Sequence, residues 1–401
     1  MYIDANAERL DHLKVPSLDD DADEDEPQDD DVEDDVFHED DDEEDRVPMT
    51  LGFAKEPKNS WSLLRQYFPS KAGGTPAWLD PVHLPSEKST LCDFCCEPLQ
   101  FLLQVYAPLS EESTFHRTLF VFMCPSMTCL LRDQHEQWRR HPDTQSRSVK
   151  VFRCQLPLVN SFYSTEAPAT EGTEQPLTAA ALLCSWCGTW KGDKICSVCR
   201  RARYCSMKHQ AAHWQSTNSS HRVFCRQAEI AGKESESAAA SNSLWPEYEI
   251  TNKDECEPDN EIPNDNESVG ALISRTRADG SVEEFETYFN GEADKRSWAS
   301  FQDRLSLDPD QILRYSRSTQ AKPIWPVSGG RPSEFDIPKC SYCGGKRGFE
   351  FQVLPQLLYF FHVEDGVGSL DWATIVVYTC EASCEGPLGY REEFAWVQLA
   401  S

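Results

Sequence analysis

The sequence predicts an α+β, β-rich protein in which two related β units flank a small Cys/His-rich block, with disordered acidic segments beside them. Three observations support this prediction. A sequence motif with Cys-x-x-Cys, Phe and Gln-Val at the same spacing occurs twice, in CDFCCEPLQFLLQV at 92–105 and in CSYCGGKRGFEFQV at 340–353. Short segments rich in aromatic and β-branched residues, typical of strands, follow both copies. Finally, a long run of Asp and Glu near the N-terminus contains almost no apolar residue.

The acidic residues are concentrated near one end of the chain. Of the 27 residues from Asp19 to Asp45, 20 are Asp or Glu, and the 401-residue chain has a net charge of −30. Such a segment buries too little apolar surface to offset its ordering entropy, so we expect disorder. The charge disfavours nucleic acid, because it repels phosphates, and it favours a basic partner.

Changes in composition predict six segments along the chain. They are an acidic disordered tail (1–46), a first β unit (47–163), a linker (164–181), the Cys/His-rich block (182–227), a second acidic disordered linker (228–283) and a second β unit (284–401). We find no signal-peptide pattern and no apolar stretch of membrane-spanning length. A cytoplasmic or nuclear protein is therefore expected, in which the 17 cysteines stay reduced.

The first β unit contains three segments with the length and composition of strands, at 101–109, 117–124 and 148–157. The polar segment 131–148 is expected to be a loop or a short exposed helix.

In the second unit, 298–315 is expected to be helical, with Asp308-Pro309 as an N-cap and first-turn pair. Strands are expected in the three segments FEFQVLPQLLYF, TIVVYTC and REEFAWVQLA that follow.

The sequence similarity between the two units extends beyond the Cys-x-x-Cys motif. AGGTP (72–76) matches SGGRP (328–332), and TLFVFMC (118–124) matches TIVVYTC (374–380). Each unit then closes on a strand that ends in Gln-Leu. The same order of features over some 80 residues indicates a duplicated unit.

Each unit supplies four thiols in two close pairs, and four thiolates form a common closed zinc site. The spacing predicts one structural zinc on Cys92, Cys95, Cys124 and Cys129, and one on Cys340, Cys343, Cys380 and Cys384. Cys96 is an alternative ligand in the first set, and ordinary buried cysteines are the alternative for both sets. Four thiolates would leave no open coordination position for chemistry.

The central block has the ligand spacing of a double zinc site. Two Cys-x-x-Cys pairs are followed by Cys-x₃-His and His-x₃-Cys, which makes eight ligands for two tetrahedral ions. The block resembles the MYND-type zinc finger, including YCSMKHQAAHW. The resemblance implies interleaved sites, one on Cys184, Cys187, Cys205 and His209, the other on Cys196, Cys199, His221 and Cys225.

Three details of the finger bear on its function. His209 stands where the family more often has cysteine, and His213 is not at a ligand position. The resemblance implies a protein-interaction module that binds proline-containing peptides. The basic run Arg200-Arg201-Ala202-Arg203 is interpreted as a solvated face, because it is short and the chain is acidic.

The segments around the finger make the resemblance more specific. LGFAKEP (51–57), FPSKAGGTPAWL (68–79), FHRTLFVF (115–122), FEFQVLPQLL (349–358) and EEFAWVQ (392–398) are similar to the programmed cell death protein 2 family. The resemblance implies that the two units form one pseudo-symmetric body with the finger inserted. It also implies a non-enzymatic chaperone or escort of a newly made small-subunit ribosomal protein, supporting 40S biogenesis in the cytoplasm with nuclear shuttling.

The residues themselves are compatible with this role. Acidic segments mask the charge of a basic client, although the alternative for the tail is a purely solubilising appendage. Exposed edges of a small sheet capture extended peptides by strand addition. Trp78, Phe101, Trp372 and Trp396 are candidates for lining a groove, although core packing is the default for such residues.

Two other functional classes are considered. An enzyme is not expected, because no nucleophile or nucleotide motif is present and only Cys96, Cys154 and Cys256 lie outside the proposed sites. The alternative is a nuclear adaptor that recruits corepressor-type partners through the finger. Neither direct nucleic-acid binding nor membrane association is expected.

Overall fold

The computed structural model describes residues 47–139, 146–168, 177, 181–216, 221–223, 225, 244–255, 292–364, 366, 368–386 and 389–399. The predicted acidic tail lies outside these residues, as does Cys256. Within this part of the chain, no helix is both long and apolar enough to cross a membrane.

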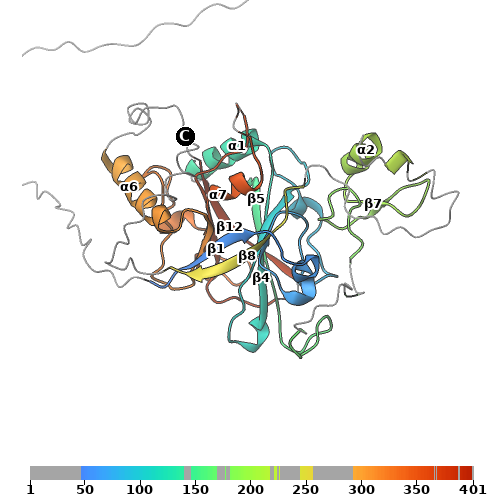
Figure 1. The fold of residues 1–401 in the computed structure, drawn as a ribbon, viewed down its shortest axis with the longest axis horizontal. Helices are drawn as coiled ribbons and strands as arrows, with labels where there is room; N and C mark the ends of the chain where they lie inside the picture. The colour runs from blue at the N-terminus through green and yellow to red at the C-terminus, as the bar shows by residue number, and fades with distance from the viewer. Residues whose placement is uncertain are drawn as a thin grey trace, which may run out of the picture. The chain divides into compact units, whose positions relative to one another are not determined.

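The described strands form a closed β-barrel and a small two-stranded sheet (Figure 1). Around the barrel the order is β1 (Thr50–Lys55), β8 (Tyr248–Asp254), β2 (Lys71–Ala72), β3 (Gln100–Tyr106), β4 (His116–Met123), β5 (Val149–Leu156), β12 (Tyr390–Gln398), β11 (Thr374–Cys380), β10 (Arg347–Val353) and β9 (Gln311–Tyr315). The small sheet pairs β6 (Lys194–Ile195) with β7 (Arg203–Tyr204).

Several barrel strands, among them β3, β4 and β11, are buried on both faces. In β4, Leu119 and Val121 belong to the largest apolar core, whereas Phe120 and Phe122 between them pack in a second, aromatic core. Successive side chains point to opposite faces of a strand, so a run such as TLFVFM supplies both cores at once. This explains why the strand reads as continuously apolar.

The large aromatic residues proposed for a groove are core residues. Trp78 and Phe101 belong to the aromatic core, Trp372 belongs to the largest core, and Trp396 packs with Tyr378 and Phe394. All four are buried, which confirms the default expectation of core packing and not the groove. In the closed order of the barrel every described barrel strand has a neighbour on both sides, which disfavours strand addition to the barrel.

The two halves of the barrel share strand register in part. Gln104 pairs with Phe120 on the next strand, as Gln352 pairs with Val376. Each first strand also has a bulge, between Phe101 and Leu103 and between Phe349 and Phe351.

The predicted match of the Gln-Leu endings is displaced by one residue. Thr118 pairs with Cys154, whereas Thr374 pairs with Gln398. The residue of the first half that corresponds to Gln398 is therefore Cys154 and not Gln155.

The expected helix at 298–315 ends earlier than predicted. Helix α6 spans Glu292–Leu307, and β9 begins at Gln311. A turn separates them, in which Asp308 N–H donates to Leu305 O and Gln311 N–H donates to Asp308 O. Pro309 cannot continue the i to i−4 ladder, so the Asp-Pro pair ends one helix and does not begin another.

The expected disordered linker at 228–283 contains a strand. Strand β8 pairs with β1 along six residues and with β2 along two, and Ile250 is buried in the core. The residues after Ile250, TNKD, are polar, and Asn252, Lys253 and Asp254 among them are exposed. The rest of that linker lies outside the described residues, apart from 244–247 and Glu255.

Two short helices complete the barrel region, α1 (Met127–Trp138) and α7 (Gln356–Phe360). Helix α1 occupies much of the segment expected to be a loop or a short exposed helix, yet Asp133, Gln134 and Gln137 on it are buried. Gln137 Nε2 donates to Val397 O and Gln137 Oε1 accepts from Val397 N–H, both at 2.9 Å. Helix α1 therefore supplies hydrogen-bond partners to the backbone of β12 in the part of that strand that β5 does not pair with.

Candidate metal centres

Four Cys-x-x-Cys turns have the same local geometry. In each, the N–H of the residue after the second cysteine donates to the carbonyl of the first, from Cys96, Gly188, Arg200 and Gly344 at 2.8–2.9 Å. Each of these residues has a positive φ, between 54° and 73°. The turn directs two thiols to one point, which is why the spacing alone identifies them.

The first β unit brings its four predicted ligands together. The turn with Cys92 and Cys95 precedes β3, Cys124 directly follows β4, and Cys129 lies near the start of α1. Their ligand atoms all lie within 4.8 Å of one another. Cys96 is the left-handed residue of the turn, is exposed and is not in this group, so the alternative ligand is not supported.

The second β unit places its ligands at equivalent points. Cys340 and Cys343 precede β10, and Cys380 and Cys384 come at and after the end of β11. The Sγ atoms of Cys343 and Cys380 are 3.6 Å apart, and those of Cys340 and Cys384 are 3.7 Å apart. Arg391 Nη1 donates to Cys384 Sγ at 2.8 Å, which balances part of the charge of a thiolate there.

The finger forms two groups, interleaved along the chain as the resemblance implied. In the first, His209 lies on α2 (Met207–Gln215), and its Nδ1 is 3.2 Å from Cys205 Sγ. Ser206 caps α2 by accepting the His209 N–H, which fixes the start of the helix beside the site. Cys184 and Cys187 complete this group.

The second finger group contains Cys196, Cys199, His221 and Cys225. His221 Nε2 lies 3.3 Å from Cys199 Sγ. His213 is in neither group; it is buried, and its Nδ1 lies 3.1 Å from Tyr204 Oη.

The donor sets fit zinc. A tetrahedral ion with Zn–S bonds of about 2.3 Å requires sulfurs about 3.8 Å apart. The closest Sγ–Sγ distances in the four groups lie between 3.6 and 4.0 Å. Sulfur and imidazole donors are those that zinc prefers.

The thiols within a group perturb one another. The hydrogen bond between Cys92 and Cys124 lowers the pKa of Cys92 to about 5 and raises the pKa of Cys124. Burial lowers the pKa of His209, but hydrogen bonds to the thiols of Cys184 and Cys187 outweigh it and raise this pKa to about 9. In the first β-unit group the shift favours a thiolate at Cys92, which suits a cation.

Comparison with known proteins shows which protein family the chain is similar to. It matches the model of the programmed cell death protein 2 N-terminal domain over residues 48–170, the MYND finger over 184–225 and the programmed cell death protein 2 C-terminal putative domain over 295–399. Programmed cell death protein 2 of Bos taurus is 38% identical over 366 residues, covering 88% of this chain and 97% of that relative. This chain belongs to the programmed cell death protein 2 family.

More distant relatives are also similar. Programmed cell death protein 2-like of Homo sapiens is 28% identical, covering 82% of this chain and 89% of the relative. The probable 20S rRNA accumulation protein 4 of Schizosaccharomyces pombe is 26% identical over 121 residues, covering 26% of this chain and 28% of the relative. No solved structure matches.

In this member of the programmed cell death protein 2 family, the finger is anchored to the barrel. Trp190, from the finger, is buried in the aromatic core and packs against Phe122 with ring centroids 4.4 Å apart. Its Nε1 donates to Leu99 O at 2.7 Å, and Trp78 Nε1 donates back to Thr189 O at 2.9 Å. Lys208 on α2 pairs with Glu97 beside the first β-unit site.

Sequence reasoning missed Trp190. It follows the first Cys-x-x-Cys turn as Cys-Gly-Thr-Trp and is not a ligand, so the metal spacing says nothing about it. One signal in the sequence could have predicted its role. Trp190 is a large apolar side chain in a segment that has little core of its own, so it must pack against another part of the protein.

Proposed function

We propose that this protein is a non-enzymatic, zinc-binding chaperone or escort of a newly made basic protein of the small ribosomal subunit, acting in 40S biogenesis. The family membership supports the proposal, because one relative carries 20S rRNA accumulation in its name. The charge of −30 is the observation in the chain itself that supports a basic client. Work in the cytoplasm, where the client is made, and passage to the nucleus follow from this role.

We infer four structural zinc ions, one for each group described above. Each group offers four S or N donors and so leaves no coordination position for a substrate. Structural zinc in small finger domains contributes on the order of 10 kcal/mol to folding, and this chain would use it to hold turns at the barrel ends.

We also infer that the first and second β units, 47–163 and 284–401, are copies of one unit. The shared register and bulges of β3 and β10 support this, as do two glutamines. Gln104 donates to Pro69 O and accepts from Ala77 N–H, and Gln352 both donates to and accepts from Ile324. The antiparallel pairing of β5 with β12 would then join the copies.

A second candidate function is a nuclear adaptor role of the finger. The observation in its favour is a set of exposed apolar side chains on the finger, Val198, Met207, Trp214 and Val223. Proline-containing peptides are the expected ligands of such a surface in MYND fingers.

The test is affinity capture of the tagged protein from cells, with and without puromycin, followed by quantitative mass spectrometry. We expect one basic small-subunit ribosomal protein at near-stoichiometric level, with partial loss when puromycin releases nascent chains. Chromatin factors in its place, with ribosomal proteins at background, would overturn the chaperone proposal and favour the adaptor.

A further inference from the structure

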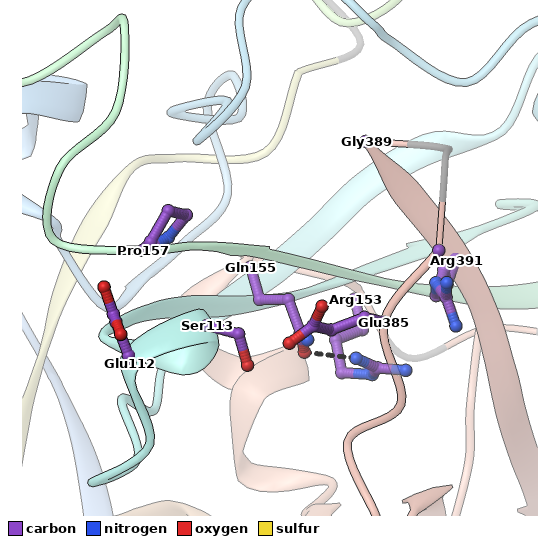
Figure 2. Close-up of a pocket in the computed structure, with 9 residues that line it drawn as sticks. Glu112, Ser113, Arg153, Gln155, Pro157, Glu385, Gly389 and Arg391 are labelled. Atoms are coloured by element: carbon purple, nitrogen blue, oxygen red, sulfur yellow. Dashed lines mark hydrogen bonds between the residues drawn. The ribbon is translucent and has the colours of Figure 1, made fainter.

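A cavity of about 540 Å³ lies where the two halves of the barrel separate. Strand β5 pairs with β12 only from Val151 to Cys154, so Gln155 and Pro157 continue beyond the start of β12. The space beside them is bounded by η4 (Glu112–Thr114) and by Glu385, Gly386 and Arg391. Figure 2 shows Glu112 and Ser113 on one side of it, Arg391 on the other, and Gln155 and Glu385 between them.

Arg153 in this cavity is already paired. Its Nε donates to Glu393 at 2.7 Å, and Nη1 donates to Gln155. Both Nη atoms also approach Cys384 O, at 3.3 and 3.4 Å. Its side chain is fully buried, and its partner Glu393 is shared with Arg347, so Arg153 forms a buried wall of the cavity.

Contacts within the described part of the chain occupy only part of the Arg391 guanidinium. Nη1 donates to Cys384 Sγ, and the guanidinium lies over the Tyr342 ring, 4.7 Å from its centroid. It packs so closely on Gly386 that a Cβ there would lie 1.5 Å from Nη2. Within the described residues no hydrogen bond occupies Nε or Nη2, which leaves these donors to a ligand in the cavity.

Two carboxylates face the same space without a partner. Glu112 and Glu385 are both exposed, and neither forms an ion pair or a side-chain hydrogen bond within the described part of the chain. They do not belong to any of the groups able to hold a metal ion. The two free carboxylates are exposed, whereas the guanidiniums of Arg153 and Arg391 are buried, so the exposed rim of the cavity favours a cation. The remaining donors of Arg391 favour a neutral carbonyl beside it.

We propose that this cavity binds an Arg or Lys side chain of an extended segment of a basic protein. Glu112 and Glu385 accept the charged group, and Arg391 donates to a backbone carbonyl of the same segment. The volume suits a short peptide segment. Because every described barrel strand already has a neighbour on both sides, we propose recognition through side chains of the cavity in place of strand addition. The identification of the ligand as the ribosomal client rests on the proposed function.

The test is photo-crosslinking of the full-length protein with acetyl-Ser-Arg-photoleucine-Arg-Ser-amide at 150 mM salt. Mass spectrometry maps the attachment sites. We expect crosslinks near Glu112–Ser113, Gln155–Pro157 and Glu385–Gly386, at least tenfold weaker with the isosteric peptide in which citrulline replaces arginine. The double variant E112K/E385K should also lose these crosslinks at least tenfold.

The matched control is E56K/D310K, which changes the net charge equally at two exposed acids outside the cavity. It should keep the crosslinks within twofold of the unmodified chain. Zinc content and urea unfolding verify that both variants fold. Crosslinks only in the acidic run 19–45, or an equal loss in both variants, would overturn the proposal.

Capture of the client separates this inference from the proposed function. If the unmodified chain captures a basic ribosomal protein and E112K/E385K captures it equally well, the cavity proposal fails and the function stands. If the unmodified chain captures none, the function fails, and the peptide crosslinks still decide whether the cavity binds basic segments.

Discussion

The residue after each Cys-x-x-Cys turn adopts the left-handed conformation. Glycine occupies this position at Gly188 and Gly344, where it has no steric cost, but Cys96 and Arg200 have φ of 58° and 54°. The ligand spacing made all four turns predictable, because it is local in sequence. The role of Cys96 was not predictable, since two adjacent cysteines differ only in the backbone conformation that the turn imposes.

Replacing Cys96 with glycine should therefore leave metal binding unchanged. Cys96→Gly should keep the zinc content and raise the free energy of unfolding by about 1 kcal/mol, because the left-handed strain is relieved. Cys95→Gly should lose one zinc ion per chain. Native mass spectrometry measures the zinc content, and urea unfolding measures the free energy of unfolding. Loss of zinc from Cys96→Gly would show that Cys96 is a ligand.

At the scale of elements, Trp190 is the finger side chain most deeply buried in the barrel. Trp190 fills the space between Trp78, Phe122 and Phe152, all from the first β unit. A finger has little core of its own, so the barrel supplies the apolar surroundings that this indole requires. The first finger site, with Cys184 and Cys187 just before Trp190, is thus linked to the stability of the barrel.

Two tryptophans of the finger should respond differently to truncation. Trp190→Ala should lower the free energy of unfolding by about 3–5 kcal/mol, because it leaves a cavity in the aromatic core. Trp214→Ala, at a residue 37% exposed, should change it by less than about 1 kcal/mol. Urea unfolding followed by circular dichroism compares them; equal effects would mean that the finger is not anchored through Trp190.

Strands with continuous apolar sequences were predictable, whereas a strand that depends on pairing partners distant in sequence was not. β3, β4 and β5 follow their aromatic and β-branched runs closely. β8 was missed because its pairing partners β1 and β2 lie far away in sequence and only Ile250 enters the core.

At the scale of the molecule, buried charges join the two halves of the barrel. Arg117 on β4 and Glu350 on β10 form a bidentate pair at 2.6 and 2.8 Å, and both side chains are fully buried. Arg317 and Thr379 also donate to Glu350, which occupies the bulge of β10. The sequence could not indicate this pair, because its members are 233 positions apart and belong to strands that do not pair.

The Glu350 pair predicts a pH dependence of stability. Burial raises the pKa of Glu350, but Arg117 and Arg317 outweigh it and lower this pKa from 4.5 to about 2. The ionised carboxylate therefore stabilises the fold fully above about pH 4.5, and this contribution is lost as pH falls towards 2. Glu350→Gln should lower the free energy of unfolding by about 3–5 kcal/mol at pH 7, since it leaves two arginines uncompensated.

The comparison with the unmodified chain is made by urea unfolding between pH 7 and pH 3. Acid also protonates the thiolates and imidazoles of the four metal groups in both proteins. The quantity of interest is therefore the difference in the free energy of unfolding between the two proteins, which should shrink below pH 4.5. Glu56→Gln, at an exposed position, is the control and should differ little at any pH. A difference that stays constant down to pH 3 would contradict the role of the carboxylate.

The strand order has a consequence for synthesis on the ribosome. β5 emerges from the exit tunnel more than 230 residues before β12, its neighbour in the barrel. At typical elongation rates that interval is roughly 10 to 50 seconds, whereas hairpins form in microseconds. Every newly made molecule thus passes through a half-built stage with an uncovered strand edge. During that interval Trp190 of the finger, which is made next after the linker, can pack on the aromatic face of the unfinished barrel beside Trp78 and Leu79, which have already emerged.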